Sequence, residues 1–243
     1  MTELEQTERF EVRFIGRLRT GFGEKFGIPR QSGLAETAAE LVFEPPYRDA
    51  NALRGIEEYS HLWLIWQFSE CIREDWSPTV RPPRLGGNTR MGVFATRSPY
   101  RPNPIGLSCV RLSRVEWSTP RGPVLHVIGA DLMDGTPILD IKPYLPYTDS
   151  HPEAAGGFTD RTEFPELEVR IPEALTDGIP EETDKELRRI LAQDPRPAYR
   201  RDEADRIYGL TYRDLRVRFR VDGTLLTVCG IQLREGEQGG EAQ

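Results

Sequence analysis

The sequence predicts a mainly β protein, with an N-terminal β-barrel domain and a small α+β domain at the C-terminus. Three observations lead to this fold class. Short apolar runs separated by turns and irregular loops recur over residues 10–130, as in barrels and sandwiches. Segment 181–193 carries apolar residues at helical spacing. Segment 215–221 alternates apolar residues with arginine, as a half-buried strand does.

The strands expected in the N-terminal part are short. Residues 10–19 alternate apolar and polar side chains, and residues 39–43 end at a Pro-Pro pair. Residues 62–66 are continuously apolar, which predicts a strand buried on both faces. Glycine and proline favour a loop at 20–31. The other expected strands are 92–96, 107–115 and 124–130.

These segments divide the chain into four parts. We expect the barrel, with the catalytic site, in 1–150, and a polar linker or irregular cover in 151–180. The α+β domain follows in 181–234, with its helix starting after Pro180 and a hairpin turn at Asp222-Gly223. Residues 235–243 are expected to form a disordered tail.

Composition excludes several classes of protein. The three cysteines are widely spaced and give no disulfide framework, which suits a reducing compartment. The N-terminus is polar and acidic, unlike a signal peptide, and the longest apolar run, 62–68, is too short to span a bilayer. The three histidines have no zinc-ligand spacing. We therefore expect a cytoplasmic protein with no membrane segment and no metal.

The charge is unevenly distributed. The net charge of −7 argues against a general nucleic-acid coat. Yet no acidic residue lies between Asp75 and Glu116, a stretch that contains seven arginines. These arginines are either a solvated surface or a local anion site, and the composition alone leaves both interpretations open.

Three proline-rich loops suggest a binding site. They are 26–31, 81–87 and 97–106, and each combines prolines with arginine or amide side chains. Proline lowers the entropy cost of holding such side chains in one geometry. Segment 131–137 adds two carboxylates at an Asp-Gly turn, where they can face a cation or accept a proton.

The same loops resemble motifs of the TrmO family (TsaA-like, YaeB-like), the tRNA N6-threonylcarbamoyladenosine methyltransferases. The resemblance spans about 15–147 and resumes at 191–200. Its motifs are 26–31, 78–88, 91–97, 101–106, 131–137, 140–146 and 191–200.

The resemblance implies a β-barrel methyltransferase that acts as a homodimer. It would transfer a methyl group from S-adenosylmethionine to N6 of threonylcarbamoyladenosine at position 37 of tRNA. By position, the cofactor would meet Pro29, Arg30, Gln31, Arg97, Leu107, Asp131, Leu132, Met133, Asp134 and Gly135. Ser69 and Glu70 stand where many members have His-Gln, so only backbone contacts to the cofactor would survive there.

The substrate that the resemblance implies is a modified base, and we expect its N6 proton to leave during or before transfer. Either Asp134 or Asp140 is a candidate base for that proton. Arginine suits tRNA phosphate or the threonyl carboxylate, and Tyr199 can stack on a base. The expected substrate-binding residues are Arg84, Arg101, Asn103, Asp194, Arg196 and Tyr199.

Three other functions fit parts of the sequence. The barrel can be an RNA-binding module without turnover, although the acidic composition speaks against it. It can be a methyltransferase acting on another RNA or on a small molecule. It can also be an S-adenosylmethionine sensor, which only an assay distinguishes from an enzyme.

Overall fold

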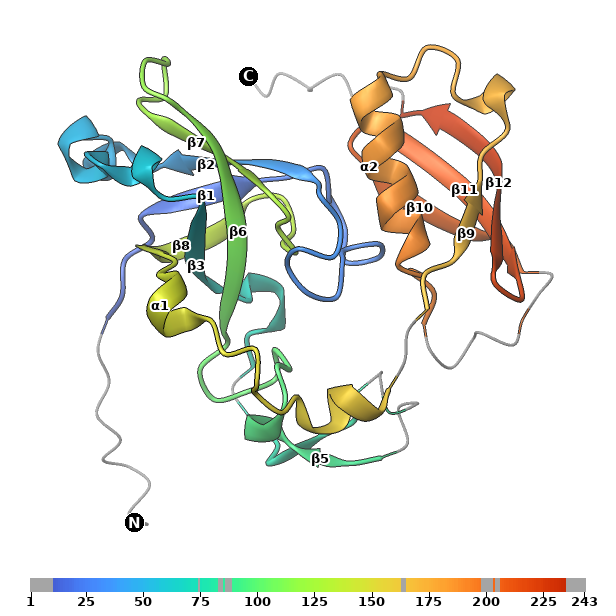
Figure 1. Ribbon diagram of the computed structural model, residues 1–243, viewed down its shortest axis with the longest axis horizontal. Coiled ribbons are helices and arrows are strands. Elements are labelled where there is room, and N and C mark those ends of the chain that lie inside the picture. Colours follow the sequence, from blue (N-terminus) through green and yellow to red (C-terminus); the bar gives the residue numbers. More distant parts are fainter. Residues whose placement is uncertain are drawn as a thin grey trace, which may run out of the picture.

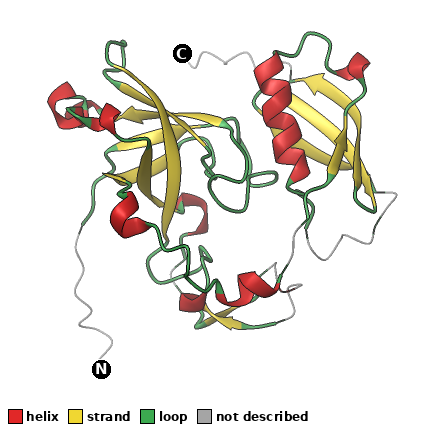
Figure 2. Cartoon of the chain, viewed as in Figure 1, coloured by secondary structure: helices red, strands yellow, loops and turns green. Residues whose placement is uncertain are grey.

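The computed structural model describes residues 11–73, 75–82, 85, 89–162, 165–197, 203 and 206–234 (Figure 2). Six strands of the N-terminal part form a closed barrel in the order β1-β2-β7-β6-β3-β8 (Figure 1). All six pairings are antiparallel. The strands are β1 (Gly16–Arg19), β2 (Ala38–Phe43), β3 (His61–Gln67), β6 (Ile105–Glu116), β7 (Val124–Ile128) and β8 (Thr136–Pro143). The barrel predicted from the sequence is confirmed.

Strand β3 shows how the barrel is packed. Leu62, Leu64 and Trp66 point inward and are buried, whereas Trp63 and Ile65 on the outer wall are only half-buried. The prediction of burial on both faces was therefore wrong. A continuous apolar run predicts two covered faces, but a barrel wall has its core on one side only.

Two other segments differ from expectation. Strand β8, which was not predicted, closes the barrel between β1 and β3, and Pro137 is tolerated because it lies at the start of the strand. The strand expected at 92–96 is instead the end of a short hairpin, β4 (Thr79–Val80) with β5 (Met91–Gly92), followed by a 3-10 helix at Val93–Ala95. Of the strand expected at 10–19, Gly16–Arg19 forms β1 and residue 10 lies outside the described residues.

The strand order brings three connections to one end of the barrel. Strands β1, β3 and β7 end there, and β2, β6 and β8 begin there. The β1–β2 loop (20–37), the β3–β6 connection (68–104) and the β7–β8 turn (129–135) therefore meet at one mouth of the barrel. These connections contain most of the residues that the sequence marked as candidates.

The C-terminal domain is a four-stranded sheet with one helix across one face (Figure 1). Its elements are β9 (Glu168–Arg170), α2 (Glu181–Ala192), β10 (Tyr208–Tyr212), β11 (Leu215–Asp222) and β12 (Leu225–Leu233). The helix and the β11–β12 hairpin were predicted, and β10 was not. Part of the expected linker 151–180 belongs to this domain, because β9 pairs in parallel with β12 and Leu167 lies in the core. The tail 235–243 lies outside the described residues.

Short helices occupy several connections. One α-helical turn, α1 (Pro146–Asp149), follows β8. The 3-10 helices are Pro45–Tyr47, Ala50–Leu53, Ile56–Glu58, Ser69–Cys71, Val93–Ala95, Gly157–Arg161 and Glu173–Leu175.

The β1–β2 loop joins the two domains. Phe22 is fully buried in the core of the C-terminal domain, where its ring centroid lies 5.1 Å from that of Tyr212. Glu186 of α2 accepts a hydrogen bond from the peptide N–H of Ala38 at the start of β2, at 2.7 Å. The peptide N–H of Arg213 donates to the carbonyl of Gly21. The loop is thus held between barrel and α+β domain.

Candidate active site

The barrel mouth brings together side chains from all three connections. Arg97, from the β3–β6 connection, donates to the Gln31 Oε1 of the β1–β2 loop at 2.5 Å. Asp131 of the β7–β8 turn also feels this charge: burial raises the pKa of its carboxyl, and the positive charge of Arg97 opposes that rise. Residues about 100 positions apart in the chain therefore form one polar cluster.

Asp131 is the partly buried carboxylate of this cluster. Ser108 Oγ donates to Asp131 Oδ1 at 2.5 Å, and Trp66 Nε1 donates to Ser108 Oγ at 3.0 Å. Burial raises the pKa of Asp131 above its usual range, while the hydrogen bond from Ser108 and the charge of Arg97 act against the rise. The site therefore holds a desolvated carboxylate that a cationic ligand can stabilise.

An open strand edge borders this carboxylate. Strand β7 ends opposite Arg111, so the first half of β6 has no strand partner on that side. The peptide N–H of Cys109 uses this edge to donate to Ser32 Oγ at 3.2 Å. The N–H of Leu107 points to the same edge because it lies two residues earlier in the strand. The Leu107 side chain is 53% exposed, so the edge offers a backbone donor beside an apolar surface.

The β7–β8 turn is anchored to the end of β1. Leu132 is buried and its carbonyl accepts a hydrogen bond from Thr20 Oγ1 at 3.1 Å. Asp134 accepts from the Thr20 N–H at 3.0 Å and pairs with Arg19 at 3.3 Å, yet remains exposed. Gly135 has φ +76°, a conformation that favours glycine. Met133, between Leu132 and Asp134, is half-buried.

Asp140 lies apart from this turn. It sits four residues beyond the start of β8, about 13 Å along the strand, opposite Ile65 of β3. Its carboxylate pairs with Lys142 at 2.9 Å and is half-exposed. The structure therefore does not bring the two candidate bases, Asp134 and Asp140, together.

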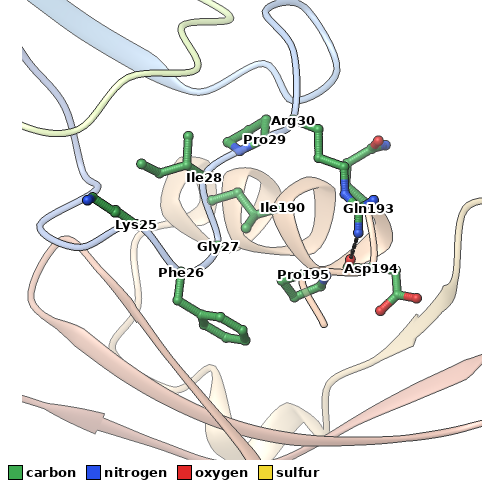
Figure 3. Close-up of a pocket in the computed structure, with 10 residues that line it drawn as sticks. All are labelled: Lys25, Phe26, Gly27, Ile28, Pro29, Arg30, Ile190, Gln193, Asp194 and Pro195. Atoms are coloured by element: carbon green, nitrogen blue, oxygen red, sulfur yellow. Dashed lines mark hydrogen bonds between the residues drawn. The ribbon is translucent and has the colours of Figure 1, made fainter. Parts of the chain in front are cut away.

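A second group of candidates lies where the β1–β2 loop meets α2 (Figure 3). Pro29 is buried, and Arg30 Nη2 approaches the carbonyls of Asp194 and Arg196 at 3.5 and 3.4 Å. Asp194 and Arg196 form a buried ion pair at 2.8 Å. A small cavity of about 110 Å³ lies here, lined by 25–30 together with Ile190 and 193–195. Residues 193–196 of the C-terminal motif thus lie beside motif 26–31 within one chain.

The remaining candidates lie on the β3–β6 connection. Ser69 and Glu70 are exposed in the 3-10 helix after β3, and the Glu70 carbonyl accepts from Lys25 Nζ at 3.1 Å. Arg101 donates to the Thr96 carbonyl at 3.2 Å, and Asn103 is exposed. Arg84 and Tyr199 lie outside the described residues.

Four residues of this site were not found from the sequence: Arg19, Ser32, Trp66 and Ser108. Trp66 and Ser108 occupy ordinary inward positions of strands β3 and β6. Their hydrogen bonds depend on strand register, so no local motif marks them.

Two classes of feature are not seen in the part of the chain that the structure describes. No group of three or more His, Cys, Asp and Glu side chains there can hold a metal ion. None of the helices found there has the length and apolar character needed to cross a membrane.

Comparison with known proteins gives consistent matches. The tRNA-methyltransferase O N-terminal domain family matches residues 17–150, and the TrmO C-terminal domain family matches 165–234. The tRNA (adenine(37)-N6)-methyltransferase of Escherichia coli K12 is 43% identical over 93% of this chain and 99% of that protein. The protein of the same name in Eikenella corrodens is 45% identical over 73% of this chain and 99% of that protein.

Solved structures agree with the sequence comparison. The crystal structure of TrmO from Pseudomonas aeruginosa superposes with a TM-score of 0.75 at 34% identity, covering 94% of this chain and 99% of that one. Both domains are included in that coverage. The chain therefore belongs to the TrmO family of tRNA methyltransferases.

Proposed function

We propose that this protein transfers a methyl group from S-adenosylmethionine to N6 of threonylcarbamoyladenosine at position 37 of tRNA. The observation that carries the proposal is the polar cluster at the barrel mouth, where a partly buried carboxylate, an arginine-glutamine pair and an open strand edge meet. The E. coli relative, named for methylation of adenine 37, covers both domains of this chain and supports the choice of substrate.

The residues at the barrel mouth fit this cofactor. S-adenosylmethionine supplies an activated methyl group on a sulfonium ion, so its site needs negative charge and apolar surface. Asp131 would supply a desolvated carboxylate on the positive side of the cofactor. Arg97, held by Gln31, would bind the methionine carboxylate, and Leu107 would offer its N–H and side chain to the adenine.

The turn 131–135 and the loop 29–31 complete the cofactor site by position. The turn is fixed by hydrogen bonds from Thr20 Oγ1 to the Leu132 carbonyl and from the Asp134 N–H to the Phe22 carbonyl. The segment just after 29–31 is held by the hydrogen bond from the Gly33 N–H to the Gly129 carbonyl. Ser69 and Glu70 would act through their peptide groups. A fixed site suits methyl transfer, because alignment of the attacking nitrogen with the methyl group supplies much of the rate.

Asp134 is our candidate for the base that removes the N6 proton. It lies on the same turn as Asp131, but its carboxylate is exposed at the barrel mouth. A nucleobase of tRNA that enters the mouth from solvent can therefore reach it. Asp140 remains the alternative, on the wall beside Ile65. The family resemblance assigns substrate binding to Arg84, Arg101, Asn103, Asp194, Arg196 and Tyr199, and of these Arg84 and Tyr199 lie outside the described residues.

We further propose that the enzyme is a cytoplasmic homodimer. Exposed apolar side chains on the outer wall support an interface, with Ile105 on β6 and Tyr147 on α1. Helix α1 is tied to that wall by the hydrogen bond from Trp63 Nε1 to Asp149. A cytoplasmic location follows from the proposed substrate. Sedimentation equilibrium that gave the mass of a monomer at micromolar concentration would exclude the dimer.

Nucleoside mass spectrometry tests the function. Bulk bacterial tRNA that lacks this methyl group is incubated with the protein and S-adenosylmethionine, then digested. We expect the mass of threonylcarbamoyladenosine to rise by one methyl group. If the nucleoside stays unchanged while a control enzyme modifies it, the tRNA activity is wrong, and cofactor binding without turnover would then indicate a sensor.

The same assay tests the base. Asp134→Asn should lower kcat by a factor of about 10² to 10⁴, with S-adenosylmethionine binding preserved, because general-base catalysis contributes about that much. Asp140→Asn is the matched variant, since it removes the other candidate carboxylate. If Asp140→Asn slows turnover and Asp134→Asn does not, the two roles are reversed.

A further inference from the structure

Strand β11 carries a row of arginines on the outer face of the C-terminal sheet. Val217 and Phe219 point into the core and are fully buried, whereas Arg216, Arg218 and Arg220 between them are exposed. Alternate residues of a strand are about 6.6 Å apart, so the three arginine side chains leave the sheet along one line of backbone positions. We call these three residues the arginine row.

The neighbours of the arginine row leave it open. Arg218 lies between Gly209 of β10 and Gly230 of β12. Its guanidinium lies over Gly230, where an added Cβ would be 3.3 Å from Arg218 Nη2. Thr211 and Thr227 flank Arg216 and Arg220. The row therefore runs between glycine and threonine residues, and the threonine hydroxyls can donate further hydrogen bonds to an anion.

The arginine row is also without acidic partners. No ion pair or hydrogen bond of these three side chains occurs in the part of the chain that is described. Asp222 lies on the same exposed face two residues after Arg220, and Glu168 of β9 pairs with Arg170 at 3.8 Å, but neither carboxylate forms an ion pair with the row. Three adjacent unneutralised guanidinium groups repel one another, and a bound polyanion removes that cost.

We propose that the arginine row binds the phosphate backbone of tRNA outside the anticodon loop. This inference rests on the proposed tRNA substrate. Charge complementarity points to a polyanion, and guanidinium groups in a line match repeated phosphates. Helix α2 covers the other face of the sheet, so the row is separated from the barrel mouth by the domain's core (Figure 1). The contact is therefore with a part of the RNA other than the modified nucleotide.

Charge-removing variants of the whole chain test the proposal. We expect the triple variant Arg216→Gln, Arg218→Gln, Arg220→Gln to raise the KM for full-length tRNA about tenfold, with kcat and the KM for S-adenosylmethionine unchanged. The slope of log Kd against log salt should decrease by about 2 to 3, because three phosphate contacts are lost. Arg→Lys at the same three positions should retain most of the affinity.

The matched control removes the same charge elsewhere. Arg13→Gln, Arg54→Gln and Arg121→Gln change exposed arginines at the opposite end of the barrel from the mouth. If this control weakens tRNA binding as much as the triple variant, net charge and not the arginine row is responsible, and the proposal falls. It also falls if the triple variant, with unchanged melting temperature, binds tRNA as the parent does.

An isolated anticodon stem-loop decides which part of the RNA is bound. We expect its KM to be the same for the parent and the triple variant, and an equal rise for stem-loop and full tRNA would refute the location. The Kd for tRNA is measured without S-adenosylmethionine, so it does not depend on turnover. A parent that binds tRNA through the arginine row but leaves threonylcarbamoyladenosine unmodified would contradict the proposed function and not this surface.

Discussion

At the scale of single residues, Asp131 combines a structural cost with a proposed role. Its carboxyl is desolvated at the barrel mouth, and burial raises its pKa. An acid whose pKa is higher in the folded than in the unfolded protein destabilises the fold when it is ionised. That cost is present above the folded pKa and is lost as the pH falls through it. We expect such a cost to persist because the charge serves binding.

Replacement of Asp131 by asparagine should therefore separate stability from binding. Asp131→Asn keeps an oxygen that accepts from Ser108 and removes the buried charge. We expect its melting temperature at pH 8 to equal or exceed that of the parent, the difference shrinking as the pH is lowered, and S-adenosylmethionine affinity by calorimetry to fall at least about tenfold. Asp177→Asn, at an exposed position, is the control. A melting temperature below the parent's at pH 8 would contradict this explanation.

At the scale of elements, the β1–β2 loop depends on close approach to the C-terminal sheet. Gly27 has φ +94°, and a Cβ there would lie 1.9 Å from Leu210 Cδ1 of β10. Gly33, in the same loop, has φ +80°, but a Cβ there would meet no atom within 4 Å. A side chain at Gly33 would therefore meet backbone strain alone, whereas one at Gly27 would meet the strain and a steric clash.

Alanine substitutions at these glycines should differ in cost. Gly33→Ala is expected to lower the unfolding free energy by about 1–2 kcal/mol, from the left-handed backbone alone. Gly27→Ala should cost a further 1–3 kcal/mol or so, because Leu210 must move. It should also raise the KM for S-adenosylmethionine, since Pro29 to Gln31 follow directly. Urea denaturation measures both variants, and equal losses would show that the contact with Leu210 does not constrain the loop.

At the scale of the whole molecule, Glu186 ties the two domains together. Its buried carboxylate accepts from the Ala38 N–H of the barrel, from Tyr212 at 2.9 Å and from Arg213 at 2.7 Å. Burial and the neighbouring charge of Glu186 raise the pKa of the Tyr212 hydroxyl, so it stays a neutral donor. Strands of both domains and α2 therefore meet at one side chain.

Removal of this carboxylate should weaken the whole fold. Glu186→Ala leaves three donors without their acceptor, two of them in the domain interface, and we expect a loss of about 3 kcal/mol in urea unfolding. Glu182→Ala, on the exposed face of the same helix, should change stability by less than about 0.5 kcal/mol. If the two variants unfold at the same urea concentration, Glu186 does not join the domains.

The sequence by itself determined those features that depend on neighbouring residues. Alternation located β11, helical spacing and Pro180 located α2, and Asp222-Gly223 located the hairpin. The loop motifs also gave the family, because irregular segments with arginine, proline and glycine at fixed positions rarely agree by chance. These signals are local, so a single sequence carries them.

The tertiary structure decided what depends on contacts between distant segments. Strand β8 lacks a clean alternation, and only its pairing with β1 and β3 makes it the closing strand. The hydrogen bond between Ser108 and Asp131 and the approach of Arg30 to Asp194 likewise depend on barrel closure and domain packing. Register and closure are collective properties of several strands, which is why no single segment of the sequence specifies them.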